Sequence, residues 1–216
     1  MVPDPDPSGE QQQLISDAAA LGVTLQPTQA AGALRLLDEL SSWNRSYNLT
    51  AITERQAMIR GHLLDSLSAY PEIDGERIAD VGTGAGFPGL PLALVAPQRQ
   101  FTLIDSVAKK LRFVTHAART LGLNNVTTQQ ARVETLSPTT PFDIVMARAY
   151  ATLADLVTGV RGLCAPATRV IAFKGRYPDD ELAELPHGWK LHHARRIEVP
   201  GLGAERHLII LVPQAY

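Results

Sequence analysis

Residues 78–89 read Ile-Ala-Asp-Val-Gly-Thr-Gly-Ala-Gly-Phe-Pro-Gly, a short apolar run that leads into a glycine-rich turn. The apolar residues predict a buried β-strand. Gly82, Gly84 and Gly86 lack β-carbons, so the chain can turn sharply and a large ligand can approach its backbone. Pro88 suits the start of a helix, because its missing N–H would have no intrahelical partner there. Strand, turn and helix predict the entrance of a nucleotide-type cofactor site.

The residues beside the turn favour a cofactor without a pyrophosphate. A dinucleotide-binding G-x-G-x-x-G turn would need its third glycine where this chain has Phe87. Asp80, at the end of the predicted strand, would repel a doubly charged pyrophosphate. S-adenosylmethionine fits better, because it carries an ammonium and a sulfonium group and no phosphate. The pattern from Asp80 to Gly86 resembles the first motif of Rossmann-like methyltransferases, with a nicotinamide-dependent oxidoreductase as the alternative.

A second acidic residue follows the turn at a suitable interval. Residues 101–104 are an apolar, β-type run that ends in Asp105. Asp105 lies roughly 20 residues beyond the turn, the spacing at which a carboxylate can accept both ribose hydroxyls. The alternative is that Asp105 caps the helix expected from about residue 107, although Ser106 could do this instead.

A polar loop completes the predicted cofactor site. Residues 125–128 are strand-like, and Val133 and Glu134 lie in the loop that follows them. In a doubly wound sheet this loop lies over the adenine, where a backbone N–H and an acidic side chain can bind the edge of the ring. We therefore include Val133 and Glu134 among the expected cofactor-binding residues.

Composition limits the class of protein. The chain has 216 residues, a net charge of −2 and 45% hydrophobic residues, which predict a soluble α/β domain with an extension. No apolar run approaches the roughly 20 residues of a membrane span. Residues 1–9 are rich in Pro and Asp, unlike a signal peptide, and are expected to form a flexible tail. The single cysteine excludes an internal disulfide and suits a reducing compartment, so we expect a cytoplasmic location.

The chain divides into a helical part and an alternating part. In residues 10–72, Leu34, Leu37 and Leu40 follow the spacing of a helix with one buried stripe, and a second helix is expected at 53–70. From residue 73 to 216, strands alternate with helices, as in a parallel sheet. Strands are predicted at 77–81, 100–104, 125–129, 142–147 and 168–173, and helices at 88–95, 107–121, 151–161 and 178–184.

The C-terminal part predicts a hairpin. Two β-type runs, at 190–199 and 206–212, are separated by a short Pro- and Gly-containing segment, which favours antiparallel pairing. The expected fold is therefore α/β. It is a Rossmann-like, class I methyltransferase fold with a mainly parallel seven-stranded sheet, a C-terminal antiparallel hairpin and an N-terminal helical extension.

An ordered series of short motifs extends over the chain from residue 34 onward. Besides the glycine turn they include Trp43-Asn44-x-x-x-Asn48-Leu49-Thr50, His62-Leu-Leu-Asp65-Ser66, Lys109-Lys110-x-x-Phe113, Phe173-Lys174-Gly175 and Glu205-Arg206-His207. In this order and spacing they resemble the RsmG family of small-subunit rRNA guanine-N7 methyltransferases, also called glucose-inhibited division protein B. The resemblance implies methyl transfer from S-adenosylmethionine to N7 of a guanine in the decoding-region loop of 16S rRNA. It implies cofactor contacts at Gly82, Phe87, Val133, Glu134 and Arg148.

The implied reaction needs little catalytic machinery. Guanine N7 has an in-plane lone pair and no proton, so in-line attack on the methyl requires no general base, and catalysis should come mainly from orientation. Arg148 and Lys174 end predicted strands and are the expected positioning residues. The alternative for Arg148 is a salt bridge to an acid such as Asp80. No metal is expected, because adjacent His192 and His193 would point to opposite faces of a strand.

The expected partner is the 16S rRNA or the small ribosomal subunit. A net charge of −2 gives no general attraction to phosphate, so RNA contacts must be local. The candidate RNA-binding residues named below could instead belong to solvated faces or cap helices. For the chain as a whole, the alternative functions are a non-catalytic RNA-binding protein and a small-molecule methyltransferase. Nothing suggests an obligate partner, so a monomer is expected. The candidate RNA-binding residues are Asn44, Arg45, Lys109, Lys110 and Arg206.

Overall fold

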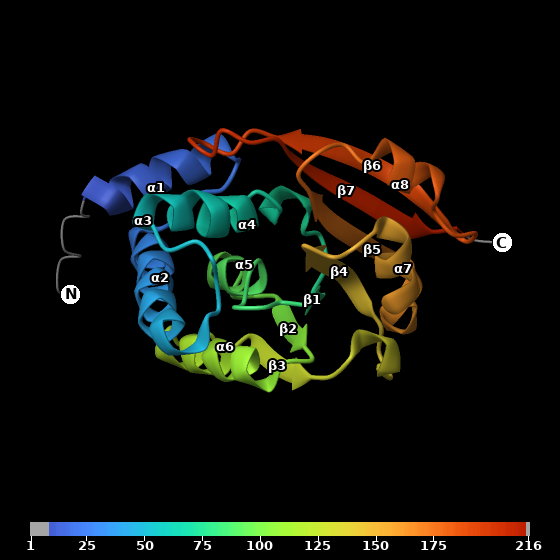
Figure 1. Ribbon diagram of the computed structural model, residues 1–216, viewed down its shortest axis with the longest axis horizontal. Helices are drawn as coiled ribbons and strands as arrows, with labels where there is room; N and C mark the ends of the chain where they lie inside the picture. Colours follow the sequence, from blue (N-terminus) through green and yellow to red (C-terminus); the bar gives the residue numbers. More distant parts are fainter. Residues whose placement is uncertain (1–8, 215–216) are drawn as a thin grey trace.

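The computed structural model describes residues 9–214, so the tail expected at 1–9 lies outside the described residues except for Gly9. The core is a seven-stranded sheet with strand order β3-β2-β1-β4-β5-β7-β6 (Figure 1). β7 runs antiparallel to β5 and β6, and the other neighbours are parallel. This confirms the predicted fold. The strands are β1 Arg77–Val81, β2 Gln100–Asp105, β3 Val126–Gln130, β4 Phe142–Arg148, β5 Cys164–Lys174, β6 Trp189–Ile197 and β7 Arg206–Pro213.

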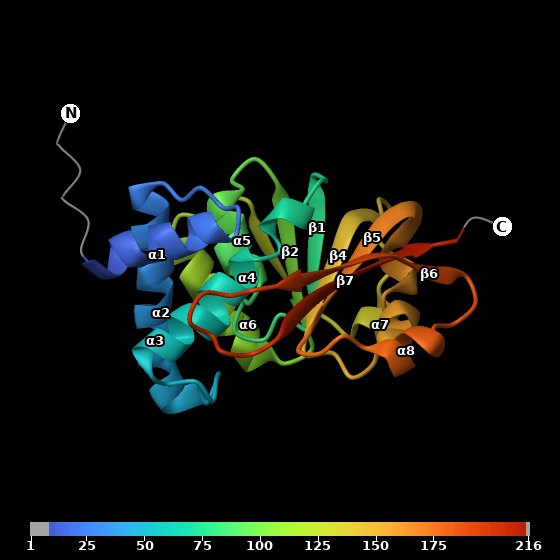
Figure 2. The same ribbon diagram turned by 90° about the horizontal axis from the view of Figure 1, so that it is seen from above.

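The helices cover both faces of this sheet. Helices α1 and α2 lie at one end of the molecule and α7 and α8 at the other (Figure 1; Figure 2). α3 continues through a π-helical turn, Ile59–Leu64, into α4, so residues 55–67 form one helical rod. None of the described helices is both long and apolar enough to span a bilayer. The α-helices are α1 Gly9–Ala20, α2 Pro27–Tyr47, α3 Arg55–Met58, α4 Asp65–Leu67, α5 Gly89–Val95, α6 Ala108–Thr120, α7 Leu153–Gly159 and α8 Asp179–Ala183.

The strands separate two hydrophobic cores. Ile144 and Met146 of β4 belong to the core that includes α1, α2, α5 and α6, whereas Val145 and Ala147 belong to the core that includes α7. Successive side chains of a strand point to opposite faces of the sheet, which produces this division. The near-continuous apolar runs that predicted the strands are therefore explained by burial on both faces.

The N-terminal helices share a core with the sheet. The predicted stripe of Leu34, Leu37 and Leu40 is buried, in the same cluster as Ile78 of β1. α2 begins at Pro27, whose fixed φ suits a first helical turn, and ends before Asn48, which has a left-handed φ of 49°. The expected helices of the extension are thus present, and α2 packs against α5 and α6, the helices that cover this face of the sheet.

One expectation about the C-terminal hairpin is wrong. β6 and β7 pair antiparallel, as predicted, but their register shifts between Leu191 and His193. An extra residue in one strand turns neighbouring side chains out of strict alternation. His192 and His193 therefore do not point to opposite faces, and their ring centroids lie 5.1 Å apart.

Candidate cofactor and substrate site

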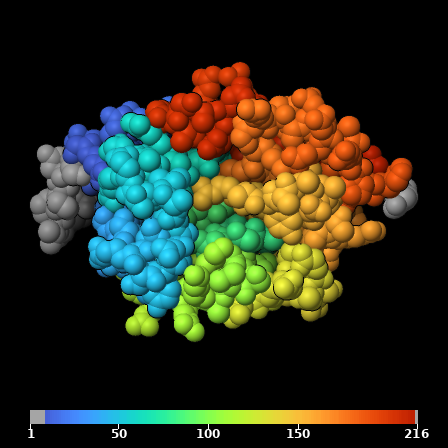
Figure 3. All heavy atoms as spheres, in the orientation of Figure 1, coloured from blue at the N-terminus to red at the C-terminus, as the bar shows by residue number. Residues whose placement is uncertain are grey.

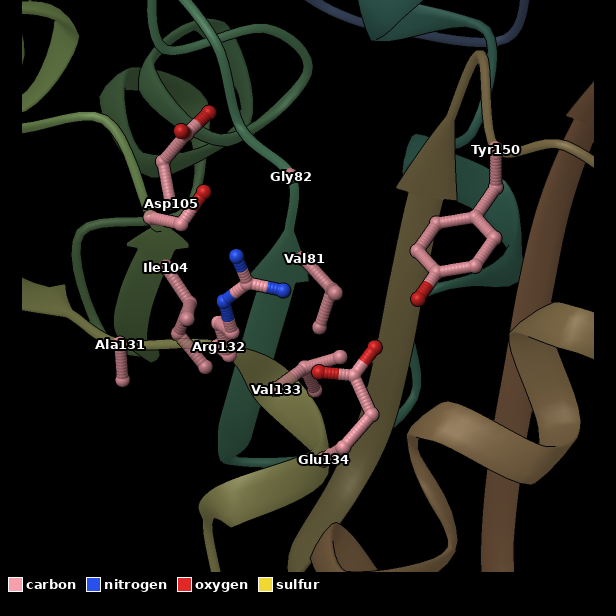
Figure 4. A pocket seen from close by; sticks show the side chains of 10 residues that line it. Val81, Gly82, Ile104, Asp105, Ala131, Arg132, Val133, Glu134 and Tyr150 are labelled. Atoms are coloured by element: carbon pink, nitrogen blue, oxygen red, sulfur yellow. The ribbon is translucent and has the colours of Figure 1, made fainter.

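A cavity of about 260 Å³ opens at the carboxyl ends of β1 and β2, where open parallel sheets bind ligands (Figure 4). It is slightly smaller than the roughly 300–1,000 Å³ typical of small-molecule sites. Of the predicted cofactor residues, Gly82, Asp105, Val133 and Glu134 line it, whereas Asp80, Gly84, Gly86, Phe87 and Arg148 do not. The lining residues are Val81, Gly82, Ile104, Asp105, Ser106, Ala131, Arg132, Val133, Glu134 and Tyr150.

The three glycines of the turn have different tasks. All three have positive φ, 66° at Gly82, 60° at Gly84 and 87° at Gly86, a conformation that favours glycine. A β-carbon on Gly82 would meet no heavy atom within 4 Å, and one on Gly84 only the Gly82 carbonyl oxygen at 3.9 Å. A β-carbon on Gly86 would lie 2.7 Å from Cγ of Leu90. Gly82 therefore leaves space in the cavity, and Gly86 leaves space for helix α5.

Asp80 stabilises the turn from below the cavity. Its side chain is fully buried, and its Oδ2 accepts hydrogen bonds from Thr83 Oγ1 at 2.6 Å and from the Gly89 N–H at 2.8 Å. Oδ1 is buried without a hydrogen-bond partner. Burial raises the pKa of this carboxyl to about 6. A buried carboxylate oxygen with no partner fits the ammonium group of S-adenosylmethionine, because such an oxygen is costly to leave unpaired.

Asp105 both lines the cavity and bonds the backbone around it. Its Oδ2 accepts from the Gly84 N–H at 3.0 Å and its Oδ1 from the Val107 N–H at 2.9 Å. Lys110 Nζ lies 3.8 Å from Oδ2. The N-cap of α6 is Val107, which makes no side-chain capping bond, so neither Asp105 nor Ser106 is the cap, and Asp105 instead accepts the N–H of the cap residue. Each carboxylate oxygen still has a lone pair for a ribose hydroxyl.

Arg148 forms the kind of ion pair that the sequence allowed, but with a different acid. Its Nη1 donates to the Gly61 carbonyl at 2.9 Å and to Asp65 Oδ2 at 3.2 Å, not to Asp80. The guanidinium lies 5.7 Å from the centroid of the buried Phe87 ring. Arg148 and Phe87 therefore face the N-terminal extension, and their implied contacts with the cofactor stay predictions.

His62 completes this cluster as a neutral group. Its ring stacks on Phe87 with centroids 4.7 Å apart, and its Nε2 lies 2.9 Å from Thr50 Oγ1. Burial, with a smaller contribution from the charge of Arg148, lowers the pKa of His62 to about 4. The Asp65 N–H donates to the His62 carbonyl within the helical rod, but among the described residues no hydrogen bond joins the two side chains. π-helical turns such as Ile59–Leu64 are frequent at functional sites.

Lys174 is occupied by an ion pair. Its side chain is 14% exposed, and its Nζ lies 2.9 and 2.7 Å from the two carboxylate oxygens of Glu181. Glu181 also accepts the N–H of Leu153 at 2.7 Å, so it connects β5, α7 and α8. The geometry gives Lys174 a structural task at the strand end, and its predicted role in positioning the substrate stays a prediction.

The candidate RNA-binding residues differ in whether their side chains already bond other groups of the protein. Asn44 bonds both the carbonyl and the N–H of Thr50, at 3.0 and 2.9 Å, and so holds the segment that follows α2. Arg206 is paired with Asp65 at 3.0 Å. Arg45 and Lys109 are exposed, and within residues 9–214 neither is part of an ion pair. Because Lys110 adjoins Asp105, a change at Lys109 alone tests RNA binding more cleanly.

The sequence did not point to Tyr150. Its side chain closes the cavity from the β4 side, across from Glu134 (Figure 4). Ala149 before it has a left-handed φ of 59°, and a β-carbon on Gly159 would lie 2.9 Å from the Tyr150 hydroxyl. Burial and the charge of Glu134 raise the pKa of Tyr150. No local sequence pattern predicts the position of Tyr150, because that position depends on the unusual backbone angle of Ala149. In the space-filling view, the segment after β4 lies between the N-terminal helices and the C-terminal hairpin (Figure 3).

Comparison with known proteins is consistent over most of the chain. Residues 29–209 match the model of the family described as rRNA small subunit methyltransferase G. Two relatives carry the name ribosomal RNA small subunit methyltransferase G. That of Hahella chejuensis is 42% identical over 93% of this chain and 92% of its own length. That of Nitrosococcus oceani is 45% identical over 90% of this chain and 91% of its own.

Solved structures share the fold at low sequence identity. An O-methyltransferase from Bacillus cereus, solved with S-adenosylhomocysteine, has a TM-score of 0.56 at 16% identity and covers 83% of this chain and 91% of its own. The O-methyltransferase TomG from Streptomyces achromogenes, solved with S-adenosylmethionine, has a TM-score of 0.55 at 16% identity and covers 96% and 100%. These neighbours show that the sheet and its helices form a methyltransferase fold, as predicted.

Proposed function

The chain belongs to the rRNA small subunit methyltransferase G family, and from that premise we propose that it methylates N7 of a guanine in the decoding-region loop of 16S rRNA. S-adenosylmethionine is the proposed methyl donor. The observation that carries the proposal is the cavity at the ends of β1 and β2, where Gly82, Asp105 and Glu134 come together. A 16S rRNA substrate agrees with the expected cytoplasmic location.

The cavity, together with Asp80 buried outside its lining, offers groups suited to this cofactor. The carboxylate of Asp105 would bind the ribose hydroxyls, and the backbone of Val133 with the side chain of Glu134 would bind the adenine edge. The unpartnered oxygen of Asp80 would receive the ammonium group. When bound, the cofactor supplies an electrophilic methyl group.

The protein's own part in the reaction is orientation. N7 of guanine attacks with a lone pair and loses no proton, so the chain needs to hold the base in line with the methyl group. His62 is buried and its lowered pKa keeps it neutral near pH 7, which suits packing against Phe87 rather than proton transfer. Within residues 9–214, no group of three His, Cys, Asp or Glu residues could hold a metal. A monomer remains the expected state.

The reaction is tested by transfer of labelled methyl groups. We expect label to enter isolated small subunits or deproteinised 16S rRNA, and chemical cleavage at 7-methylguanosine to map it to one guanine. Label at another base atom would contradict the N7 assignment, and no incorporation into either RNA would contradict the substrate. Calorimetric titration with NADH beside S-adenosylmethionine separates the nicotinamide alternative, which predicts tighter binding of NADH.

Asp80 predicts a pH dependence of cofactor binding. Burial raises its pKa to about 6 in the free protein, so the carboxyl gains a proton as the pH falls through that value. Only the ionised form attracts an ammonium group, and binding therefore releases a proton. Affinity for S-adenosylmethionine is expected to fall below pH 6 and to level off above it, as measured by calorimetry.

The substitution Asp80→Asn should lower the affinity and abolish this pH dependence. Asp143→Asn is the matched control, because one oxygen of Asp143 also accepts two hydrogen bonds, here from the N–H groups of Glu76 and Arg77 at 2.8 and 2.9 Å, but at the opposite end of β1. An unchanged pH profile in Asp80→Asn would remove Asp80 from the ammonium site.

A further inference from the structure

Asp65 binds two arginines from two different strands. Its side chain is 3% exposed, and its Oδ2 lies 3.2 Å from Arg148 Nη1 while its Oδ1 lies 3.0 Å from Arg206 Nε. Neither arginine pairs with a second carboxylate among the described residues. One buried negative charge therefore faces two positive charges, which leaves one positive charge without a direct counter-ion.

Both arginines lie at the end of the sheet that is formed by the carboxyl ends of its parallel strands, where the cavity also opens. Arg148 ends β4, which runs parallel to β1. β7 is antiparallel to β5, and its residue His207 is opposite Lys174 at the end of β5, so Arg206 at the start of β7 reaches the same end of the sheet. Asp65 belongs to the N-terminal extension. A single carboxylate of the extension thus fixes two side chains of the sheet beside the cofactor cavity.

Further contacts hold the extension and this end of the sheet in a fixed relation. His62, on the same helical rod as Asp65, stacks on Phe87 of the glycine turn. A β-carbon on Gly201 would lie 2.7 Å from Arg60 Nε, so the rod also contacts the turn between β6 and β7. Asp65 therefore has rigid neighbours on both sides, as a residue that orients others requires.

The remaining donors of the two arginines suit an anion. Each guanidinium has five N–H donors in a planar fork, and Asp65 accepts one from each arginine. Arg148 also donates from Nη1 to the Gly61 carbonyl, and its Nη2 lies 3.5 Å from His62 Nδ1. Arg206 Nη1 donates to the Glu205 carbonyl at 2.8 Å, so Arg148 Nε and Arg206 Nη2 are the nitrogens without a partner among residues 9–214. Such forks match the geometry of a phosphate group. Neither arginine lines the cofactor cavity, and a phosphate of the RNA is the anion that the proposed substrate supplies.

We propose that Asp65 is a positioning residue that orients Arg148 and Arg206 toward a phosphate of the substrate RNA beside the target guanine. The proposal rests on the proposed function. It makes the N-terminal extension part of the substrate site, because without Asp65 the two like-charged guanidiniums repel each other and lose a common orientation.

The substitution Asp65→Asn tests this, with Glu72→Gln as matched control. Glu72 also lies between two basic groups of the hairpin, with Arg195 Nε at 3.4 Å and His193 Nε2 at 3.0 Å, and it is outside the site. Asp65→Asn is expected to raise KM for small subunits roughly tenfold to a hundredfold, because misplaced binding groups lose orientation. Affinity for S-adenosylmethionine should be unchanged, and Glu72→Gln should alter thermal stability but not KM.

A double-mutant cycle with Arg206→Gln separates positioning from folding. If Asp65 acts through Arg206, Asp65→Asn raises KM much less in the Arg206→Gln background than in the wild type. An equal rise in both backgrounds, an equal effect of Glu72→Gln, or a loss of cofactor affinity at unchanged KM would overturn the proposal. A wild-type chain that methylates neither substrate would instead contradict the proposed function.

Discussion

Gly82→Ala is expected to lower the affinity for S-adenosylmethionine by about tenfold or more, which corresponds to about 1.4 kcal/mol. Gly82 lines the cavity, and a β-carbon there has no protein atom within 4 Å, so the added methyl group enters space that the cofactor is proposed to fill. The φ of 66° adds a backbone strain of roughly 1 kcal/mol, which affects folding rather than binding. Calorimetric titration measures the affinity.

Gly122→Ala provides the control for strain. Gly122 has a φ of 68°, and a β-carbon on it would also meet nothing within 4 Å, but it lies in the turn between α6 and β3 and does not line the cavity. Both variants should lose similar thermal stability, and only Gly82→Ala should lose affinity. Wild-type affinity in Gly82→Ala would show that the cofactor does not occupy this cavity.

The structure distinguishes the glycines of the turn by what each one faces. Gly84 lies at the centre of the motif, but it does not line the cavity, and its N–H donates to Asp105. Its φ of 60° would strain a β-branched residue such as Val, so Gly84→Val would disturb the turn and the binding site together. The motif identifies the turn, whereas only the backbone angles and neighbours identify which glycine faces the ligand.

The strands could be predicted from the sequence because the signal is local. The central strands are apolar runs between turn residues, and the observed β1 at Arg77–Val81 has the predicted bounds. The shift in register near His193 could not be predicted, because one extra residue in a strand leaves apolar periodicity almost unchanged. Asp105 was predicted correctly as a residue at the end of β2, but not its bonds to Gly84 and Val107, which depend on turn geometry.

The ion pairs of the site lay beyond the reach of sequence patterns. Arg148 and Asp65 are 83 positions apart and meet only when the helical rod of the extension packs on the sheet. The motifs singled out both residues, and the division of the chain near residue 72 assigned them to different parts. Arg206 was expected to bind RNA directly. Because it is paired with Asp65, any role of Arg206 in RNA binding also involves this acid.

Gly89→Ala is expected to lower the free energy of unfolding by about 2 kcal/mol, although alanine is the better helix former. Gly89 begins α5, and a β-carbon on it would lie 2.7 Å from Asp80 Oδ2 and 2.8 Å from Leu103 Cγ. Its N–H donates to the same Asp80 oxygen, so relief of the collision would stretch a buried hydrogen bond to a carboxylate. The roughly 1 kcal/mol gained in helix propensity cannot offset this. Urea unfolding measures the difference.

Gly32→Ala in α2 shows what the same change does where a neighbour can yield. The nearest atom to a β-carbon on Gly32 would be Cδ1 of Leu94 at 3.2 Å, the end of a flexible side chain, so the change in unfolding free energy should be much smaller than at Gly89. Equal stability of Gly89→Ala and the wild type would mean that α5 does not pack tightly on Asp80. In that case water could reach the buried oxygens of Asp80. The unpaired oxygen would then have a partner in the free protein, and the argument that it binds an ammonium group would lose its basis.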